Sequence, residues 1–255
     1  MGDRIDINGH PTWVEQFDGD GDTVLLLHGG LSNGDTLLDS IGGAIRERHR
    51  VVAFDRRGHG RTADTPAPFS YDEMAGETIA VLERVVDGPA HLVGWSDGGI
   101  ISLLVALRRP ELVRRMVVIG TNFHHEGNMP LDFGPSEDGF AMIRHSYDER
   151  SPDGPEHFEE VAGKTFQMFA SEPTMTVDDL RRIEAPTLVM VGDDDLIKLS
   201  HTVELYESLP NGQLSVVPAT SHVLPLEQPD VVADIVLRFL AAPVPPQTMM
   251  PVRRH

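Results

Sequence analysis

Six short, largely apolar runs constrain the fold of this chain more than any other feature. A strand with one face in water alternates apolar and polar residues, whereas a strand covered on both faces does not. The six runs follow the second pattern, and segments with helical periodicity, such as Tyr71–Val86 and Gly98–Leu107, lie between them. Strands that alternate with helices predict an α/β fold with a mostly parallel, doubly wound sheet. The runs are Val24–Leu27, Val51–Phe54, Ala90–Val93, Met116–Ile119, Thr187–Val191 and Leu214–Val217.

The alternation is interrupted near the N-terminus and in the second half of the chain. Arg4–Ile7 and Thr12–Phe17 flank an Asn8-Gly9 turn, which predicts an antiparallel hairpin. Between residues 121 and 183, irregular glycines and prolines surround apolar clusters, which predicts a helical cap insertion above the sheet. We therefore expect residues 1–120 and 184–241 to form the core, 121–183 the cap, and the proline-rich stretch 242–255 a flexible tail.

The charge balance and the absence of cysteine exclude several classes of function. Lys plus Arg total 21 and Asp plus Glu total 40, giving a net charge of −19, which disfavours a nucleic-acid or anionic-membrane partner. Without cysteine there is no disulfide, thiolate metal site or thiol nucleophile. The first residues do not resemble a secretion signal, and no apolar run is long enough to span a bilayer, so we expect a cytoplasmic protein. A small-molecule substrate is the expected partner, and the oligomeric state is left open.

The strongest local signal is Gly94-Trp95-Ser96-Asp97-Gly98-Gly99, between the run that ends at Val93 and the helix that starts near Gly98. A sharp strand-to-helix turn lifts the side chain at its apex above the sheet, and small residues on either side prevent clashes. Ser96 would then lie at a helix N-terminus, where backbone N–H groups favour developing negative charge. The alternative is that Ser96 only caps a glycine-rich helix start.

A serine nucleophile needs a base and an orienting acid, and both are expected at the same edge of the sheet. His222 follows the last apolar run, and Asp193, Asp194 and Asp195 follow the run Thr187–Val191. The chain order is therefore Ser, Asp, His. After the first run, His28-Gly29-Gly30 would let the N–H of Gly30 approach a substrate oxygen, and with the N–H of Asp97 form an oxyanion hole. On its own, the His28-Gly29-Gly30 segment is more typical of a plain strand-to-helix turn than of an oxyanion hole.

Taken together, these segments resemble the α/β-hydrolases, with the Asp55–Thr62 turn as a fifth matching segment and coverage from about Val24 to Leu240. The resemblance selects Asp195 as the acid and implies that Ser96, Asp195 and His222 form a catalytic triad. It implies no cofactor. It also makes the Asp55–Thr62 turn structural, although Arg56 and Arg57 in it could bind an anion.

The turn sequence is most similar to that of valacyclovirase-like amino-acid ester hydrolases and some enol-lactonases. That similarity implies that Asp97 could pair with a substrate amine. The alternative is that Asp97 supports the helix N-terminus or a nearby arginine. Adjacent His124 and His125 lack a carboxylate at ligand spacing, so no metal site is expected. Four apolar residues of the insertion either line a substrate pocket or form the insertion's own core: Phe123, Met142, Phe166 and Phe169.

The sequence therefore predicts a serine hydrolase that cleaves a small carboxylic ester or lactone through an acyl-enzyme. One alternative keeps the triad but changes the reaction: the protein would be a cofactor-free haloperoxidase-like perhydrolase or a carbon–carbon bond hydrolase. Another is a non-catalytic member of the fold that binds a small hydrophobic ligand.

Overall fold

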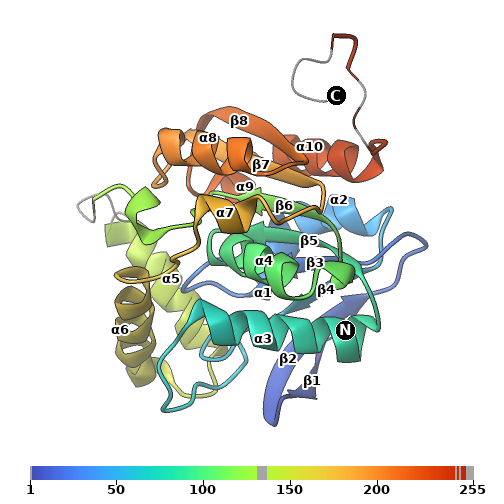
Figure 1. Cartoon of the computed structure of the whole chain (residues 1–255). Coiled ribbons are helices and arrows are strands. Elements are labelled where there is room, and N and C mark those ends of the chain that lie inside the picture. The colour runs from blue at the N-terminus through green and yellow to red at the C-terminus, as the bar shows by residue number, and fades with distance from the viewer. Residues whose placement is uncertain (1, 131–136, 245, 247, 251–255) are drawn as a thin grey trace.

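The computed structural model describes residues 2–130, 137–244, 246 and 248–250. Within these residues eight strands form one sheet, in the order β1-β2-β4-β3-β5-β6-β7-β8 (Figure 1). β2 pairs antiparallel with both of its neighbours, β1 and β4. All pairings in the rest of the sheet, from β4 through β3, β5, β6 and β7 to β8, are parallel. This topology confirms the predicted α/β fold. The strands are β1 (Gly2–Ile7), β2 (His10–Phe17), β3 (Val24–Leu27), β4 (Val51–Phe54), β5 (Ala90–Trp95), β6 (Val113–Ile119), β7 (Thr187–Asp194) and β8 (Gly212–Ser221).

The helices cover both faces of this sheet. Alternate residues of β3 belong to two separate hydrophobic clusters, because successive side chains of a strand point to opposite faces. Leu25 and Leu27 pack with residues of α3 and α4, whereas Val24 and Leu26 pack with residues of η1, α2 and α10. The core helices are α1 (Gly34–Leu37), α2 (Gly43–Arg46), α3 (Tyr71–Val81), α4 (Asp97–Arg108), α8 (Leu199–Ser208), α9 (Leu224–Glu227) and α10 (Pro229–Ala241), with π-helical turns η1 (Leu38–Gly42) and η2 (Leu82–Val86).

Three further helices lie between β6 and β7 in the sequence. They are α5 (Glu137–Arg150), α6 (Phe158–Phe169) and α7 (Val177–Leu180), with short 3-10 turns η4 (His125–Gly127) and η5 (Pro155–His157) around them and η3 (Pro110–Leu112) before β6. Figure 1 shows α5 and α6 side by side at one end of the sheet. Phe158 and Val161 of α6 are fully buried and belong to the same cluster as the α3 and α4 side of the core. The division into core and cap by residue number stays a prediction.

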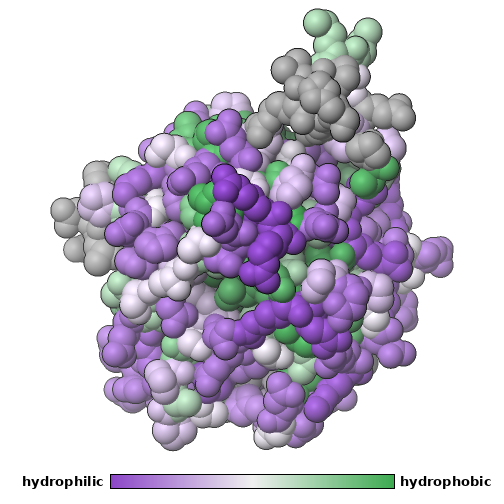
Figure 2. Space-filling model, viewed as in Figure 1, coloured by the Kyte–Doolittle hydropathy of each residue, from purple (hydrophilic) through white to green (hydrophobic). Residues whose placement is uncertain are grey.

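The face of the molecule shown in Figure 2 is mostly hydrophilic, with scattered hydrophobic patches. Among the described residues, no helix combines the length and the hydropathy needed to cross a membrane. The predicted flexible tail, 242–255, lies partly outside the described residues, which there comprise 242–244, 246 and 248–250.

Candidate active site

A strained turn at the end of β5 places Ser96. Its backbone has φ 54° and ψ −117°, a conformation that a residue with a side chain rarely adopts. The turn requires glycine on both sides, since a methyl group on Gly94 would lie 2.2 Å from the carbonyl oxygen of Gly98. A methyl group on Gly98 would in turn lie 2.0 Å from the carbonyl oxygen of Leu27. The close approach of α4 to β3 and β5 thus fixes the serine at the carboxyl edge of the sheet.

Ser96, His222 and Asp195 come together at this edge. His222 Nε2 lies 3.0 Å from Ser96 Oγ, and His222 Nδ1 lies 2.7 Å from Asp195 Oδ1. The side chain of Asp195 is 1% exposed and that of His222 is 16% exposed. The imidazole therefore joins a hydroxyl and a buried carboxylate in one hydrogen-bonded line. This is the arrangement in which a histidine can take a proton from the hydroxyl while the carboxylate fixes the ring.

The acid loop distinguishes its three aspartates. Asp195 Oδ1 also accepts the N–H of Ile197 at 2.9 Å, whereas Asp194 is exposed and Asp193 accepts the N–H of Thr220. Gly120, with φ 54°, lies against the pair, because a methyl group there would lie 3.0 Å from His222 Nδ1. Only a residue without a side chain fits at that point without pushing the imidazole away.

The backbone N–H groups of Gly30 and Asp97 were the predicted oxyanion donors. Within the described residues, neither Gly30 N–H nor Asp97 N–H donates to another protein atom. The Asp97 amide opens α4, and a helix start presents unsatisfied N–H groups. A methyl group on Gly30 would lie 2.7 Å from both Asp97 Oδ2 and Phe169 Cζ. The segment around Gly30 and the start of α4 are therefore adjacent, with an aromatic ring from α6 over them.

The Asp97 side chain is held in a buried polar cluster. Its Oδ1 accepts a hydrogen bond from the hydroxyl of Tyr71 at 2.8 Å. Its Oδ2 lies 3.8 Å from Arg56 Nη2 and accepts no hydrogen bond from any of the residues that the structure describes. Burial raises the pKa of Asp97, and the charge of Arg56 opposes that rise. Burial, together with the nearby Asp97 charge, raises the pKa of Tyr71 well above 10, so Tyr71 is a donor.

The predicted apolar pocket residues have different environments. Phe123 is 5% exposed, and its ring stacks on His201 with centroids 4.1 Å apart. Phe169 lies over Gly30, as described above. Met142 is 72% exposed on α5 and Phe166 is 47% exposed on α6, so a contact of these two residues with substrate stays a prediction.

Two further features involve histidines other than His222. His124 and His125 stack on each other at 4.5 Å. In the part of the chain that the structure describes, no group of three or more His, Asp or Glu side chains could hold a metal ion. A surface groove of about 530 Å³ beside α7 and α8 is lined by Arg181, Lys198 and His201, among others, and includes neither Ser96 nor His222.

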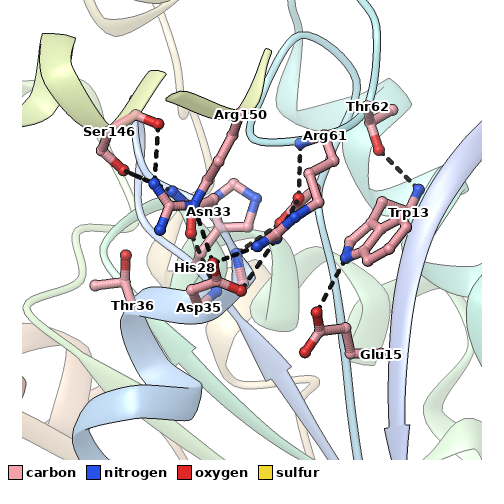
Figure 3. Close-up of polar contacts among 12 residues, drawn as sticks. Trp13, Glu15, His28, Asn33, Asp35, Thr36, Arg61, Thr62, Ser146 and Arg150 are labelled. Carbon is pink, nitrogen blue, oxygen red and sulfur yellow. Dashed lines mark hydrogen bonds and ion pairs between the residues drawn. The ribbon is translucent and has the colours of Figure 1, made fainter. Parts of the chain in front are cut away.

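The segment after Gly30 is tied to α5 (Figure 3). Asp35 accepts hydrogen bonds from Arg61 Nη2 at 2.6 Å and from Arg150 Nε at 2.9 Å. Asn33 Nδ2 donates to Ser146 Oγ at 3.0 Å. Arg150 and Ser146 belong to α5. The insertion is therefore hydrogen-bonded to the stretch that follows His28-Gly29-Gly30, the candidate oxyanion loop.

Three contributors to the site were not predicted from the sequence: Arg56, Gly120 and the indole of Trp95. The family resemblance implied a structural role for the turn that contains Arg56. In the structure, the Arg56 side chain is fully buried and donates to the carbonyl oxygen of Gly29. Gly120 follows a predicted strand directly, and a glycine at the carboxyl end of a parallel strand is the signal that could have indicated it. The Trp95 indole reaches His222 across the edge, a contact that no local pattern reveals.

Comparison with known proteins agrees with this architecture. Residues 24–235 match the alpha/beta hydrolase family, and the chain belongs to that family. The protein named "Putative carbamate hydrolase RutD" from Rhizobium rhizogenes is 29% identical, over 88% of this chain and 94% of its own length. Human "Serine hydrolase BPHL" is 26% identical, over 93% of this chain and 85% of its own length.

Among solved structures, a "Serine Hydrolase Involved in the Carbazole Degradation (CarC enzyme)" superposes with a TM-score of 0.80. It is 22% identical, and the match covers 94% of this chain and 98% of that one, a likeness that concerns the fold. The family and the names of these relatives identify the protein as a hydrolase.

Proposed function

We propose that this hydrolase cleaves a small carboxylic ester or lactone through an acyl-enzyme formed on Ser96. The observation that carries the proposal is the continuous line from Ser96 Oγ through His222 to Asp195, with distances of 3.0 and 2.7 Å. A free hydroxyl is a weak nucleophile, and a base within hydrogen-bond reach activates it. The buried carboxylate orients the imidazole and stabilises its cation.

The proposed reaction proceeds in two halves. Ser96 Oγ attacks the carbonyl carbon while His222 Nε2 takes the hydroxyl proton, and the carbonyl oxygen becomes an oxyanion. The N–H groups of Gly30 and Asp97 bind that oxygen, a contribution worth about 10²–10³ in rate for each donor. His222 then passes the proton to the leaving oxygen. Water, activated by the same imidazole, releases the acyl group and restores Ser96.

The surroundings of Gly30 favour a small acyl group. Phe169 and Asp97 both crowd the position beside Gly30, each within 2.7 Å of where a single added carbon would lie. An acyl chain bound next to the oxyanion donors therefore has little room on that side. This supports short esters and compact lactones over long-chain lipids.

Labelling by a fluorophosphonate, together with hydrolysis of p-nitrophenyl acetate, tests the proposal. We expect the native protein to be labelled and active, and Ser96→Ala to lose both properties. Ser208→Ala is the matched control, because its hydroxyl donates to the backbone carbonyl oxygen of Glu204 within α8. A folded native protein that is neither labelled nor active on a panel of short esters and lactones would support the non-catalytic, ligand-binding alternative.

A second candidate substrate class is an ester that carries a primary amine. It is favoured by Oδ2 of Asp97, which faces Gly30 and has no hydrogen-bond partner in the described part of the chain. Arg56 at 3.8 Å already supplies a cation to the same oxygen, which disfavours a second one. Asp97→Asn discriminates the two: a loss of activity confined to amino-acid esters would assign Asp97 to amine binding, and equal effects on all esters would exclude that role.

A further inference from the structure

The peptide group between Gly29 and Gly30 is hydrogen-bonded through its carbonyl oxygen, on the side opposite its N–H. Its carbonyl oxygen accepts Arg56 Nη2 at 2.9 Å and also lies 2.7 Å from His28 Nδ1. The other terminal nitrogen of Arg56, Nη1, donates to the carbonyl oxygen of His28 at 2.6 Å. Two consecutive carbonyls are thus fixed by one guanidinium. The N–H of this peptide group belongs to Gly30, the proposed oxyanion donor.

The imidazole of His28 is held in one tautomer by the same turn. The backbone N–H of Arg56 donates to His28 Nε2 at 3.2 Å, so Nδ1 must carry the hydrogen that the carbonyl oxygen of Gly29 accepts. Burial, together with the charge of Arg56, lowers the pKa of His28 well below its ordinary value. His28 therefore stays neutral, and the formal charge on this peptide's partners comes from Arg56 alone.

The charge of Arg56 also offsets the negative charge of Asp97. The Asp97 carboxylate lies beside Gly30, where an oxyanion would form, and a negative charge there opposes the transition state. Arg56 lies 3.8 Å from Asp97 Oδ2, and both side chains are almost fully buried, at 0% and 2% exposure. In such a site the attraction is weakly screened, so the guanidinium offsets the carboxylate.

We propose that Arg56 is a positioning residue for the oxyanion hole: it orients and polarises the Gly29–Gly30 peptide and compensates the Asp97 charge. Charged donors form stronger hydrogen bonds than neutral ones, and bonds in a chain polarise one another. A guanidinium on the carbonyl oxygen therefore makes the Gly30 N–H a better donor to an oxyanion. The inference rests on the proposed function, because it assumes that Gly30 N–H binds the oxyanion.

An aryl trifluoromethyl ketone isolates this role. Ser96 Oγ adds to its carbonyl carbon, the hydroxyl proton moves to His222, and the carbonyl oxygen becomes an oxyanion in the hole. We expect Arg56→Gln to raise the inhibition constant about 10- to 100-fold and to lower kcat by a similar factor. KM for p-nitrophenyl acetate should change less than about threefold, since the ground-state ester carries no such charge. Equal rises in KM and the inhibition constant, or no rise in either, would overturn the proposal.

Two further variants separate this role from a general loss of folding. Arg57→Gln is the control, because Arg57 belongs to the same turn but donates to Thr65 and Pro68. It should leave the ratio of the inhibition constant to KM unchanged. If Arg56→Gln does not fold, Asp97→Asn still tests the premise of the charge argument, that the Asp97 carboxylate acts on the oxyanion. Removing the carboxylate leaves Arg56 uncompensated, so the ketone should bind several-fold more tightly relative to KM, and an unchanged ratio would reject the compensation.

The same experiment distinguishes this inference from the proposed function. A native protein that is neither labelled by the fluorophosphonate nor inhibited by the ketone would overturn the serine mechanism itself. Native labelling and inhibition, with an unaltered ketone constant in folded Arg56→Gln, would reject only the role of Arg56.

Discussion

The indole N–H of Trp95 donates to the carbonyl oxygen of His222 at 2.8 Å. The same indole packs against the candidate oxyanion loop, since a methyl group on Gly29 would lie 3.0 Å from its Cε3. Trp95 directly precedes Ser96, so one side chain touches the loops that carry the proposed base and one oxyanion donor. Trp95 thus holds three of the four segments of the site together, although it takes no part in the proposed chemistry.

Removing this bond should slow the reaction more than it weakens substrate binding. Trp95→Phe keeps much of the ring but loses the N–H, and a buried hydrogen bond contributes about 0.5–1.5 kcal/mol. We expect kcat on p-nitrophenyl acetate to fall about 5- to 10-fold with KM nearly unchanged, together with a loss of stability of about 1 kcal/mol in urea. Trp13→Phe is the control, because the indole N–H of Trp13 donates to the Glu15 carboxylate in the N-terminal hairpin. If both variants keep native kcat, the indole bond does not position His222.

The three consecutive aspartates of the acid loop can be separated by activity. Asp195→Asn removes the charge that orients His222 and favours the wrong tautomer, so kcat should fall by up to about 10⁴-fold. Asp194→Asn is the matched control, since Asp194 is exposed and should leave kcat within about twofold of native. A large loss in Asp194→Asn with little effect in Asp195→Asn would show that the acid is misassigned.

Much of this architecture follows from local pattern. Val24–Leu27 and Val51–Phe54 are strands with the predicted bounds, because a fully buried parallel strand is apolar on both faces. The predicted strand Leu214–Val217 is longer in the structure, Gly212–Ser221, because backbone pairing with β7 continues past the apolar residues. Backbone hydrogen bonds do not depend on side-chain polarity, so a hydrophobic pattern underestimates such strands.

Contacts between segments far apart in the chain were harder to predict from the sequence. The helical stretch from Gly34 to Arg46 was not predicted, since it is broken into short pieces by a π-helical turn. The contact of Phe169 with the position beside Gly30 depends on how α6 docks on the core, and no spacing in the sequence encodes that docking. Arg56 was missed for another reason: a charged residue in a turn is ordinarily solvated, whereas this one is fully buried on two carbonyls.

A buried imidazole should make stability depend on pH. His201 accepts the N–H of Phe123 at 3.1 Å, and burial, aided by the charges of His124 and Lys198, lowers the pKa of His201 to about 4. An unfolded histidine titrates near 6.5, so between about pH 6.5 and 4 the unfolded chain binds a proton that the folded chain does not. This contribution is fully present above pH 6.5 and is lost as the pH falls, by up to about 1.4 kcal/mol per pH unit.

Urea unfolding at pH 8, 6 and 5 measures the effect. His201→Gln keeps an acceptor for Phe123 but does not titrate, so its stability should decline less steeply between pH 6 and 5 than that of the native protein. Other buried histidines contribute as well, since burial lowers the pKa of His91 to about 4 and that of His59 to about 3. The variant should therefore reduce the slope without abolishing it, and an unchanged slope would place the titration elsewhere.

The ion pair between Asp35 and Arg150 should control how firmly α5 is attached to the segment that follows the candidate oxyanion loop (Figure 3). Burial alone would raise the pKa of Asp35, but hydrogen bonds from Arg61 and Arg150 lower it, so the carboxylate is charged at neutral pH. Both arginines are about a quarter exposed, so solvent limits what either pair contributes to stability to about 1 kcal/mol.

Arg150→Ala removes this tie between α5 and the segment that follows the candidate oxyanion loop. We expect KM for p-nitrophenyl acetate to rise by up to about fivefold with kcat within about twofold, because the reacting groups lie on the core. Amide hydrogen exchange in α5 should accelerate. Arg144→Ala is the control on the same helix, since its partners Asp148 and Glu159 both lie within the insertion. If Arg144→Ala raises KM as much as Arg150→Ala does, the effect reflects the insertion's own stability and not its attachment to the segment that contains Asp35.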